Sequence, residues 1–250
     1  MIKFVSGEYV DDLKEICRHA NVCACRIMCL YDSWFSCPDM VMFWVQYTDG
    51  GMPAAAISKY GADVNVYMTE TSDKEELIAF LNMLGAASVT SNERLLDNSE
   101  RGAVMAYQGS TNSFGAENER EEDIPFLQIY SLLKKCEAED FAVPSYEDFI
   151  LDMSHRLRHR TALCSILMDG DRVAACSMTA AMSENTAVIG AVCTDPEYRR
   201  MGLGTKCVQS LLAKLGSRNI FIMRAEHKNE VFYQELGFEN TGFFYRYLSG

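Results

Sequence analysis

The sequence lacks several features that would place it in particular classes of protein. No apolar run approaches the ~18 residues that a membrane-spanning helix needs. Lys and Arg are too few for a nucleic-acid surface, and the formal net charge is −12 at pH 7. The first residues contain no apolar segment of the secretory type. We therefore expect a cytoplasmic protein that binds neither nucleic acid nor membrane.

The ten cysteines include no Cys-x-x-Cys pair, and most of them lie in apolar segments. A free cysteine in such a segment behaves as a small hydrophobic residue, so we expect reduced thiols without disulfides. Cys23 and Cys25 could supply one corner of a metal site, but no matching Cys or His pair follows. His155 and His159 share a helix face without a carboxylate at metal spacing, so ion pairing or surface placement is expected. We expect no metal.

The 250 residues, 48% of them hydrophobic, suit one large or two small globular domains. Hydrophobic spacing and turn signals predict the elements of the C-terminal half. Helices are expected at 123–137, 145–158, 205–215 and 227–236, and strands at 161–168, 173–181, 186–194, 219–225 and 241–248. The first three strands, joined by tight turns such as the Asp-Gly at 169–170, are expected to be antiparallel.

The N-terminal half repeats this pattern in a degraded form. Strands are expected at 40–47, 54–58, 64–68, 86–90 and 103–108, with a helix at 72–84 that Ser72 and Glu75 open as a capping box. An unrelated α/β cap domain is the alternative to a repeat. We expect two domains, 1–115 and 116–250, with the linker inside the polar stretch 91–122.

Residues 194–205 lie between an expected strand and an expected helix, and they form the most informative stretch of the chain. Gly202 and Gly204 let the backbone approach a ligand closely, and the first N–H groups of the helix point outward without a partner. Arg199 and Arg200 add positive charge at the same place. This geometry predicts a cradle for a pyrophosphate. Residues 69–73 of the N-terminal half contain neither Gly nor Arg, so no cradle is expected there.

Two motifs resemble those of the GNAT acyltransferase superfamily. The first is Arg-x-x-Gly-x-Gly at 199–204, and the second is Asn-x-x-x-Tyr-x-x-x-Gly-Phe at 229–238. The resemblance implies a mixed α/β fold with a mostly antiparallel central sheet and flanking helices, here duplicated with a degenerate N-terminal copy. It also implies an N-acetyltransferase with acetyl-CoA as co-substrate.

The resemblance implies roles for individual residues. Tyr233 would protonate the departing CoA thiolate as general acid, although Phe232 and Tyr233 could instead both be core residues. Asn229 would touch the pantetheine arm and could also cap its helix. The backbone at 192–194 would pair with pantetheine and polarise the thioester. The expected acetyl-CoA contacts are Val192, Cys193, Thr194, Arg199, Arg200, Met201, Gly202, Leu203, Gly204, Thr205, Asn229, Phe232 and Tyr233.

The general base is less well defined by the sequence. The candidates are Glu184, Glu197, Glu226, His155 and His227. Glu226 and His227 end a strand near the expected acyl site, and we take Glu226 as the catalytic base to be tested, with a base acting through water as the alternative. Cys193 is disfavoured as a covalent nucleophile because no His or Asn lies at a recognisable spacing.

Three functions fit these residues. The first is acetyl transfer to an amine of a small molecule or peptide, in a chain that could form a homodimer. The second is a long-chain acyltransferase that makes N-acylated amino acids, which needs a wide apolar tunnel. The third is a non-catalytic CoA-binding module, which the intact cradle and Tyr233 argue against.

Overall fold

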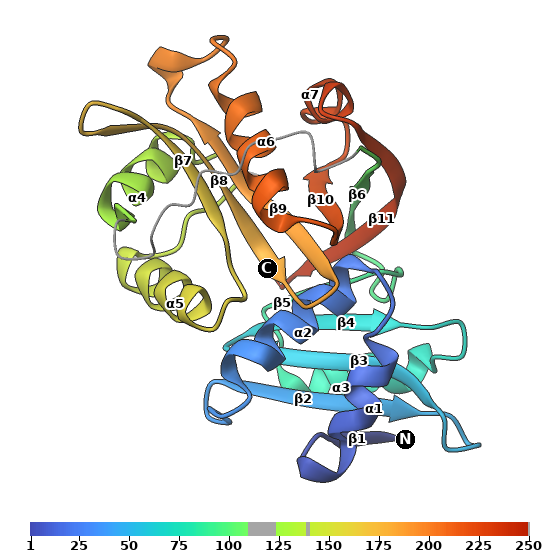
Figure 1. Ribbon diagram of the computed structural model, residues 1–250. Coiled ribbons are helices and arrows are strands. Elements are labelled where there is room, and N and C mark those ends of the chain that lie inside the picture. Colours follow the sequence, from blue (N-terminus) through green and yellow to red (C-terminus); the bar gives the residue numbers. More distant parts are fainter. Residues whose placement is uncertain (110–123, 139–140, 250) are drawn as a thin grey trace. The chain divides into compact units, whose positions relative to one another are not determined.

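The computed structural model describes residues 1–109, 124–138 and 141–249 (Figure 1). The chain divides into two compact units, and we describe each by itself. The first unit comprises Met1–Met105, Met223–Lys228 and Asn240–Gly250, and the second comprises Ala106–Ile222 and Asn229–Glu239. The expected domain boundary at 115/116 lies outside the described residues. None of the described helices is long and apolar enough to cross a bilayer.

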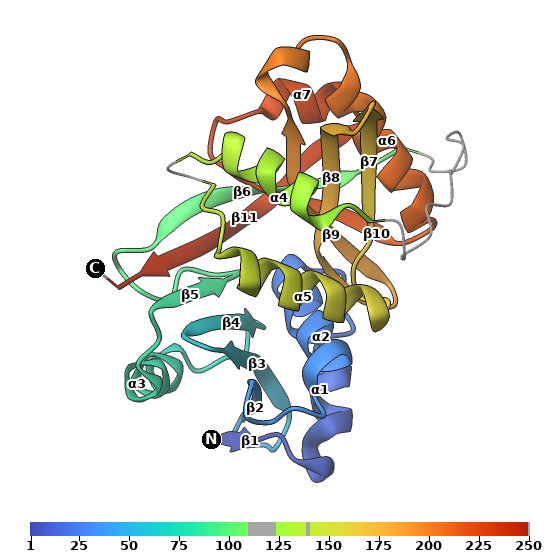
Figure 2. The same ribbon diagram turned by 90° about the vertical axis from the view of Figure 1, so that its left-hand side faces the viewer.

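The first unit is a sheet with helices on both faces. Its elements are β1 (Ile2–Phe4), α1 (Val10–Ile16), α2 (Val22–Trp34), β2 (Val41–Tyr47), β3 (Pro53–Tyr60), β4 (Asp63–Met68), α3 (Lys74–Leu84), β5 (Ser88–Ser91) and most of β6 (Glu100–Tyr107). The strands follow the order β1-β2-β3-β4-β5-β11. Helices α1 and α2 cover one face and α3 covers the other (Figure 2). Leu77 and Leu81 of α3 pack on Trp44, Ile57 and Val66 of the sheet.

Two details of the first unit differ from the expectation. Helices α1 and α2 were not expected from the sequence. Helix α3 begins one residue later than the capping box required, because Asp73 is its N-cap and accepts a hydrogen bond from the Glu76 amide at 3.1 Å. Ser72 instead donates its hydroxyl to the Ala54 carbonyl at 2.8 Å. Ser72 thereby fixes the turn before the helix.

The second unit contains the motif-bearing segments. Its elements are α4 (Phe126–Lys135), α5 (Tyr146–Arg158), β7 (Cys164–Asp169), β8 (Arg172–Met182), β9 (Thr186–Thr194), a short 3-10 helix (Pro196–Tyr198), α6 (Leu203–Leu215), the start of β10 (Asn219–Ala225), α7 (Glu230–Glu235) and the start of β11 (Phe238–Leu248). The strand order is β10-β9-β8-β7. Helices α4 and α5 pack on one face through a core that includes Ile129, Phe149 and Met178, and α6 covers the other (Figure 1).

The two units share one layout, as the sequence pattern predicted. In each, three antiparallel strands lead through a helix to a fourth strand that runs parallel to the third. The parallel pairs start in the same register, with Asp63 opposite Ser88 in the first unit and Thr186 opposite Asn219 in the second. The fold is therefore a duplicated, mixed α/β arrangement with mostly antiparallel pairing.

Candidate functional site

The turn before α6 has the backbone shape of an anion cradle. Arg200 and Gly202 adopt left-handed conformations, with φ of 64° and 76°, and Gly202 is the N-cap of α6. The first helical bond runs from the Lys206 amide to the Gly202 carbonyl, so the N–H groups of residues 203–205 precede it. A Cβ at Gly202 would meet nothing within 4 Å. The Cβ position of Gly202 is therefore open, and Arg199, Arg200 and Met201 are exposed in the same turn.

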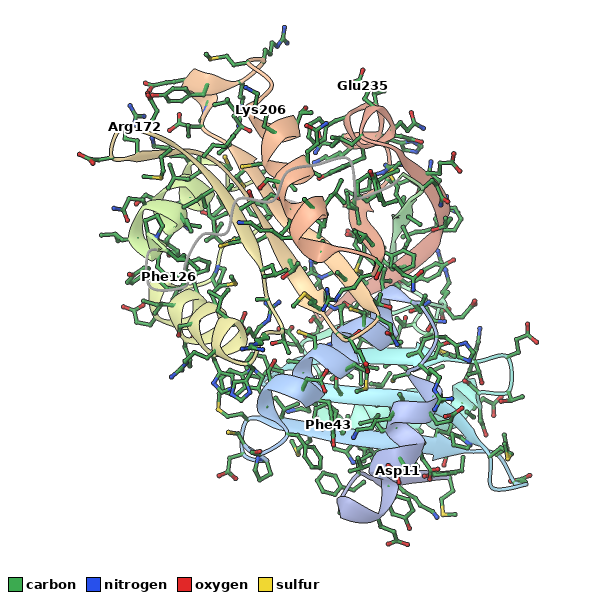
Figure 3. All side chains as sticks on the ribbon, viewed as in Figure 1. Asp11, Phe43, Phe126, Arg172, Lys206 and Glu235 are labelled. Carbon is green, nitrogen blue, oxygen red and sulfur yellow. The ribbon has the colours of Figure 1, made fainter. Side chains whose placement is uncertain are left out.

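Gly204, in the first turn of α6, lies close to both the end of β9 and α7. A Cβ on Gly204 would lie 3.0 Å from Thr194 Oγ1, at the end of β9, and 3.8 Å from Phe232 Cζ, in α7. The first turn of α6, which also holds Leu203 and Thr205, is thus in contact range of both neighbouring motif segments. Figure 3 labels Lys206 in this turn and Arg172 at the β7–β8 hairpin.

A buried carboxylate anchors the loop between β9 and the cradle. Asp195 is only 3% exposed, and its carboxylate accepts hydrogen bonds from Lys135 Nζ at 2.7 Å, Arg172 at 3.2 Å and the Glu197 amide at 3.2 Å. The Lys135 bond is the main reason that the pKa of Asp195 is lowered. Arg172 also pairs with Glu197 at 2.9 Å. This anchor was not expected from the sequence, although an Asp before Pro196 is a common N-cap signal.

We predict that this anchor makes stability depend on pH. The pKa of the Asp195 carboxyl is lower in the folded chain than in the unfolded one, so its stabilisation is present above the ordinary Asp pKa near 4 and disappears as the pH falls through the folded value. Asp195→Asn should lower the free energy of unfolding at pH 7 by about 1 to 3 kcal/mol. Urea unfolding at pH 7 and pH 3 measures this. The exposed Asp171→Asn is the control; equal losses for both variants, or the same Asp195→Asn loss at both pH values, would contradict the anchor.

Strand β9 has an irregular, extended end where the pantetheine arm was expected. Its pairing with β10 reaches Ile189, and β9 continues for five residues to Thr194. On its other side the register shifts between the pairs Met178–Gly190 and Cys176–Cys193, which leaves Ala191 and Val192 opposite the single residue Ser177. Such a bulge interrupts the ladder and redirects backbone groups. Val192, Cys193 and Thr194 all lie on this stretch.

In the first unit, the side chain of Asn92 occupies the corresponding end of β4, at Met68. The β4–β5 pairing ends at Val66–Ser91, and the Asn92 side-chain amide then donates to the Met68 carbonyl at 2.9 Å and accepts from the Met68 amide at 2.8 Å. The β3–β4 ladder runs from Ala55–Met68 to Tyr60–Asp63 without a shift. The first unit therefore has a regular strand and an internal amide where the second has a bulge and a strand end that runs on beyond its pairing with β10.

Tyr233 lies on α7 in an aromatic group. It is 8% exposed, and its ring centroid lies 5.0 Å from that of Phe232 and 6.0 Å from that of Phe238. Asn229 occupies the N-cap position of this helix, as expected, but does not cap it through its side chain. Asn229 has φ of 56° and makes no side-chain capping bond, and the helix begins at Glu230 instead of 227 because His227 and Asn229 are both left-handed.

Glu226, the predicted base, forms a two-point ion pair within the first unit. Its oxygens lie 2.6 Å and 3.1 Å from the Arg101 guanidinium, which lowers the pKa of the carboxyl. A lower pKa makes Glu226 a weaker base. His227 is highly exposed, with Nε2 3.9 Å from the Glu226 carboxylate. Among the other candidates, Glu197 pairs with Arg172 and the His155 ring stacks on that of His159.

No group of three or more His, Cys, Asp and Glu side chains suited to a metal occurs within the described residues. The ten cysteines are all free thiols, and most are buried.

Comparisons with known proteins identify the fold. Residues 126–238 match the sequence model of the Acetyltransferase (GNAT) family. A tandem GNAT protein from the clavulanic acid biosynthesis pathway aligns with a TM-score of 0.59 at 11% identity, over 100% of this chain and 99% of that chain. A GNAT-family acetyltransferase from Colwellia psychrerythraea gives 0.56 at 11% identity over 100% of both chains. A GCN5-related N-acetyltransferase from Sphaerobacter thermophilus gives 0.53 at 12% identity, over 82% and 80%. No curated protein sequence matches.

Proposed function

We propose that this chain, a member of the GNAT acetyltransferase family through residues 126–238, transfers an acetyl group from acetyl-CoA to an amine. The observation that carries the proposal is the second unit's combination of a Gly202 cradle with a bulged strand end at 191–194. The ten free thiols fit a reducing compartment, and we place the protein in the cytoplasm.

The residues present fit acetyl-CoA as a substrate. The pyrophosphate would sit against the N–H groups of residues 203–205, where the dipole of α6 and the charges of Arg199 and Arg200 favour an anion. The open space beside Gly202 leaves room for it. The pantetheine amides would pair with the backbone of Val192, Cys193 and Thr194, where β9 runs on beyond its pairing with β10.

The chemistry then needs three contributions from the protein. A backbone N–H at the bulge would polarise the thioester carbonyl and stabilise the negative charge that grows on its oxygen. A base would remove a proton from the attacking amine, and Glu226 remains the prediction to be tested, alongside a base acting through water. The Tyr233 hydroxyl would give a proton to the departing thiolate.

Asn92 leads to a prediction about stoichiometry. Because the Asn92 amide already satisfies both backbone groups of Met68, the first unit offers no strand end to an extended amide ligand. Acetyl-CoA should therefore bind with a ratio of one per chain, as measured by isothermal calorimetry. Two sites of similar affinity would show that the first unit also holds the ligand.

A thermal shift with acetyl-CoA, followed by thiol release across a panel of amines, tests the proposed function. Stabilisation together with amine-dependent release of CoA is the expected result. Faster release from a long-chain acyl-CoA would favour the N-acyl amino acid alternative. Stabilisation without release for any amine would favour a binding module. The absence of both stabilisation and release would reject the proposal.

A further inference from the structure

Three cysteines of the second unit form a cluster that the proposed reaction does not use. Cys136 follows the last residue of α4, Cys176 lies in β8 and Cys193 lies in β9. Cys176 and Cys193 are directly opposite each other in the β8–β9 register. All three residues belong to one buried cluster, and the Cys136 sulfur lies 3.6 Å from the carbonyl oxygen of Thr194, the residue after Cys193. We call these three residues the thiol cluster.

The thiol cluster reaches the proposed acetyl-CoA site through two residues. The Cys136 thiol donates to the Thr194 carbonyl at 3.6 Å, and Arg199 Nε donates to the same carbonyl at 3.4 Å. Cys136 therefore helps to hold the end of β9, to which the first arginine of the cradle also binds. Cys136 is only half-buried, whereas Cys176 is fully buried.

The thiols differ in how readily they ionise. Hydrogen bonds from Cys176 and Cys136, together with the charge of Arg199, lower the pKa of Cys193 despite its burial. The pKa of Cys136 is raised, mainly by burial. A thiolate is the nucleophilic form of cysteine, and a neighbouring Arg favours it. We therefore take Cys193, which is 4% exposed, as the attacking sulfur, and Cys136 is the neighbour with the greater exposure.

We propose that Cys193 and Cys136 form a peroxide-sensitive pair that closes as a disulfide and weakens acyl-CoA binding. The Cys193 thiolate attacks one oxygen of hydrogen peroxide, the O–O bond breaks, and hydroxide leaves with Cys193 as a sulfenic acid. The Cys136 sulfur then attacks the Cys193 sulfur, its proton goes to the departing oxygen, and water leaves. Two thiols lose two electrons in total, and one peroxide becomes two waters.

The disulfide would disturb the site because its geometry is fixed. The two sulfurs must approach to about 2.05 Å, much closer than a thiol hydrogen bond. Cys136 then leaves the Thr194 carbonyl, and the shift of this strand end weakens the bond from Arg199 to the same carbonyl. We expect the affinity for acetyl-CoA to fall by about tenfold, which corresponds to the loss of one charge-assisted hydrogen bond. The expected loss of acetyl-CoA affinity rests on the proposed function, whereas the disulfide itself does not.

Disulfide mapping tests the pair without relying on acetyl-CoA. The full chain is treated with hydrogen peroxide, free thiols are alkylated, and peptides are analysed by mass spectrometry. A linked Cys136–Cys193 peptide is expected. Cys37→Ser, which alters the other half-buried cysteine, should leave this link unchanged. A Cys176–Cys193 link, or thiols that remain alkylatable, would overturn the proposal.

Calorimetry of acetyl-CoA binding before and after peroxide tests the consequence. The loss of affinity should be reversed by dithiothreitol, persist in Cys37→Ser and be absent in Cys136→Ser. Equal affinity of the reduced and the disulfide-linked chain would overturn the coupling. Failure of the reduced chain to bind acetyl-CoA would reject the proposed function instead, while the mapping result still decides whether the pair exists.

Discussion

A carboxylate introduced at Gly202 is expected to lower the affinity for acetyl-CoA by about a hundredfold. The Cβ position of Gly202 is open, so Gly202→Asp would add a carboxylate at the N-cap of α6, one residue before the N–H groups of residues 203–205. At a separation of about 5 Å and an effective dielectric constant of about 20, two like charges repel by about 3 kcal/mol. That energy corresponds to roughly a hundredfold in affinity, which calorimetry resolves.

Gly202→Asn is the matched control for this change. Asn has the same shape as Asp, lacks its charge, and tolerates the positive φ of 76° about as well. The Asn variant measures the effect of the side chain without its charge. We expect its loss of acetyl-CoA affinity to be at least about tenfold smaller than that of Gly202→Asp. Equal affinities for the Asp and Asn variants would mean that no phosphate lies at this turn.

Tyr233→Phe is expected to lower kcat by about 10²- to 10⁴-fold while it leaves the affinity for acetyl-CoA unchanged. The ring packs against Phe232 and Phe238, and phenylalanine keeps those contacts, so the substitution removes only the hydroxyl. Thiol release under single-turnover conditions measures the chemical step apart from product release. Loss of affinity together with kcat would instead indicate a packing role.

Tyr107→Phe is the control for the loss of a hydroxyl. Tyr107 belongs to the same unit and packs against Phe238, with ring centroids 5.2 Å apart. Its variant should keep kcat within about a factor of three, a range that a general acid would exceed by far. An unchanged single-turnover rate in Tyr233→Phe would remove this residue from the mechanism.

Local patterns were sufficient to predict much of the second unit. Strands β9 and β10 begin and end where alternation and turn residues placed them. Helix α6 starts two residues earlier than expected because Gly202 is its N-cap. Helix α2 was missed because cysteines occupy many of its buried positions, including Cys23, Cys25 and Cys29, and obscure the helical period.

The site was predictable only where backbone shape determines it. The cradle depends on a short run of glycines and a helix N-terminus, and both can be recognised from sequence. The Lys135–Asp195 bond, the Asn92 amide on Met68 and the Arg101–Glu226 pair join residues that are 24 to 125 positions apart. Local periodicity contains no information about such pairs, because they depend on tertiary packing.

The most direct test of the account is acetyl transfer from isotopically labelled acetyl-CoA to a mixture of small amines and peptides, followed by mass spectrometry. The account predicts a labelled N-acetyl amine, formed in equal amount to the released CoA and absent in Tyr233→Phe. Wild-type protein that leaves both the labelled acetyl-CoA and every amine unchanged, or that only hydrolyses the thioester, would contradict it.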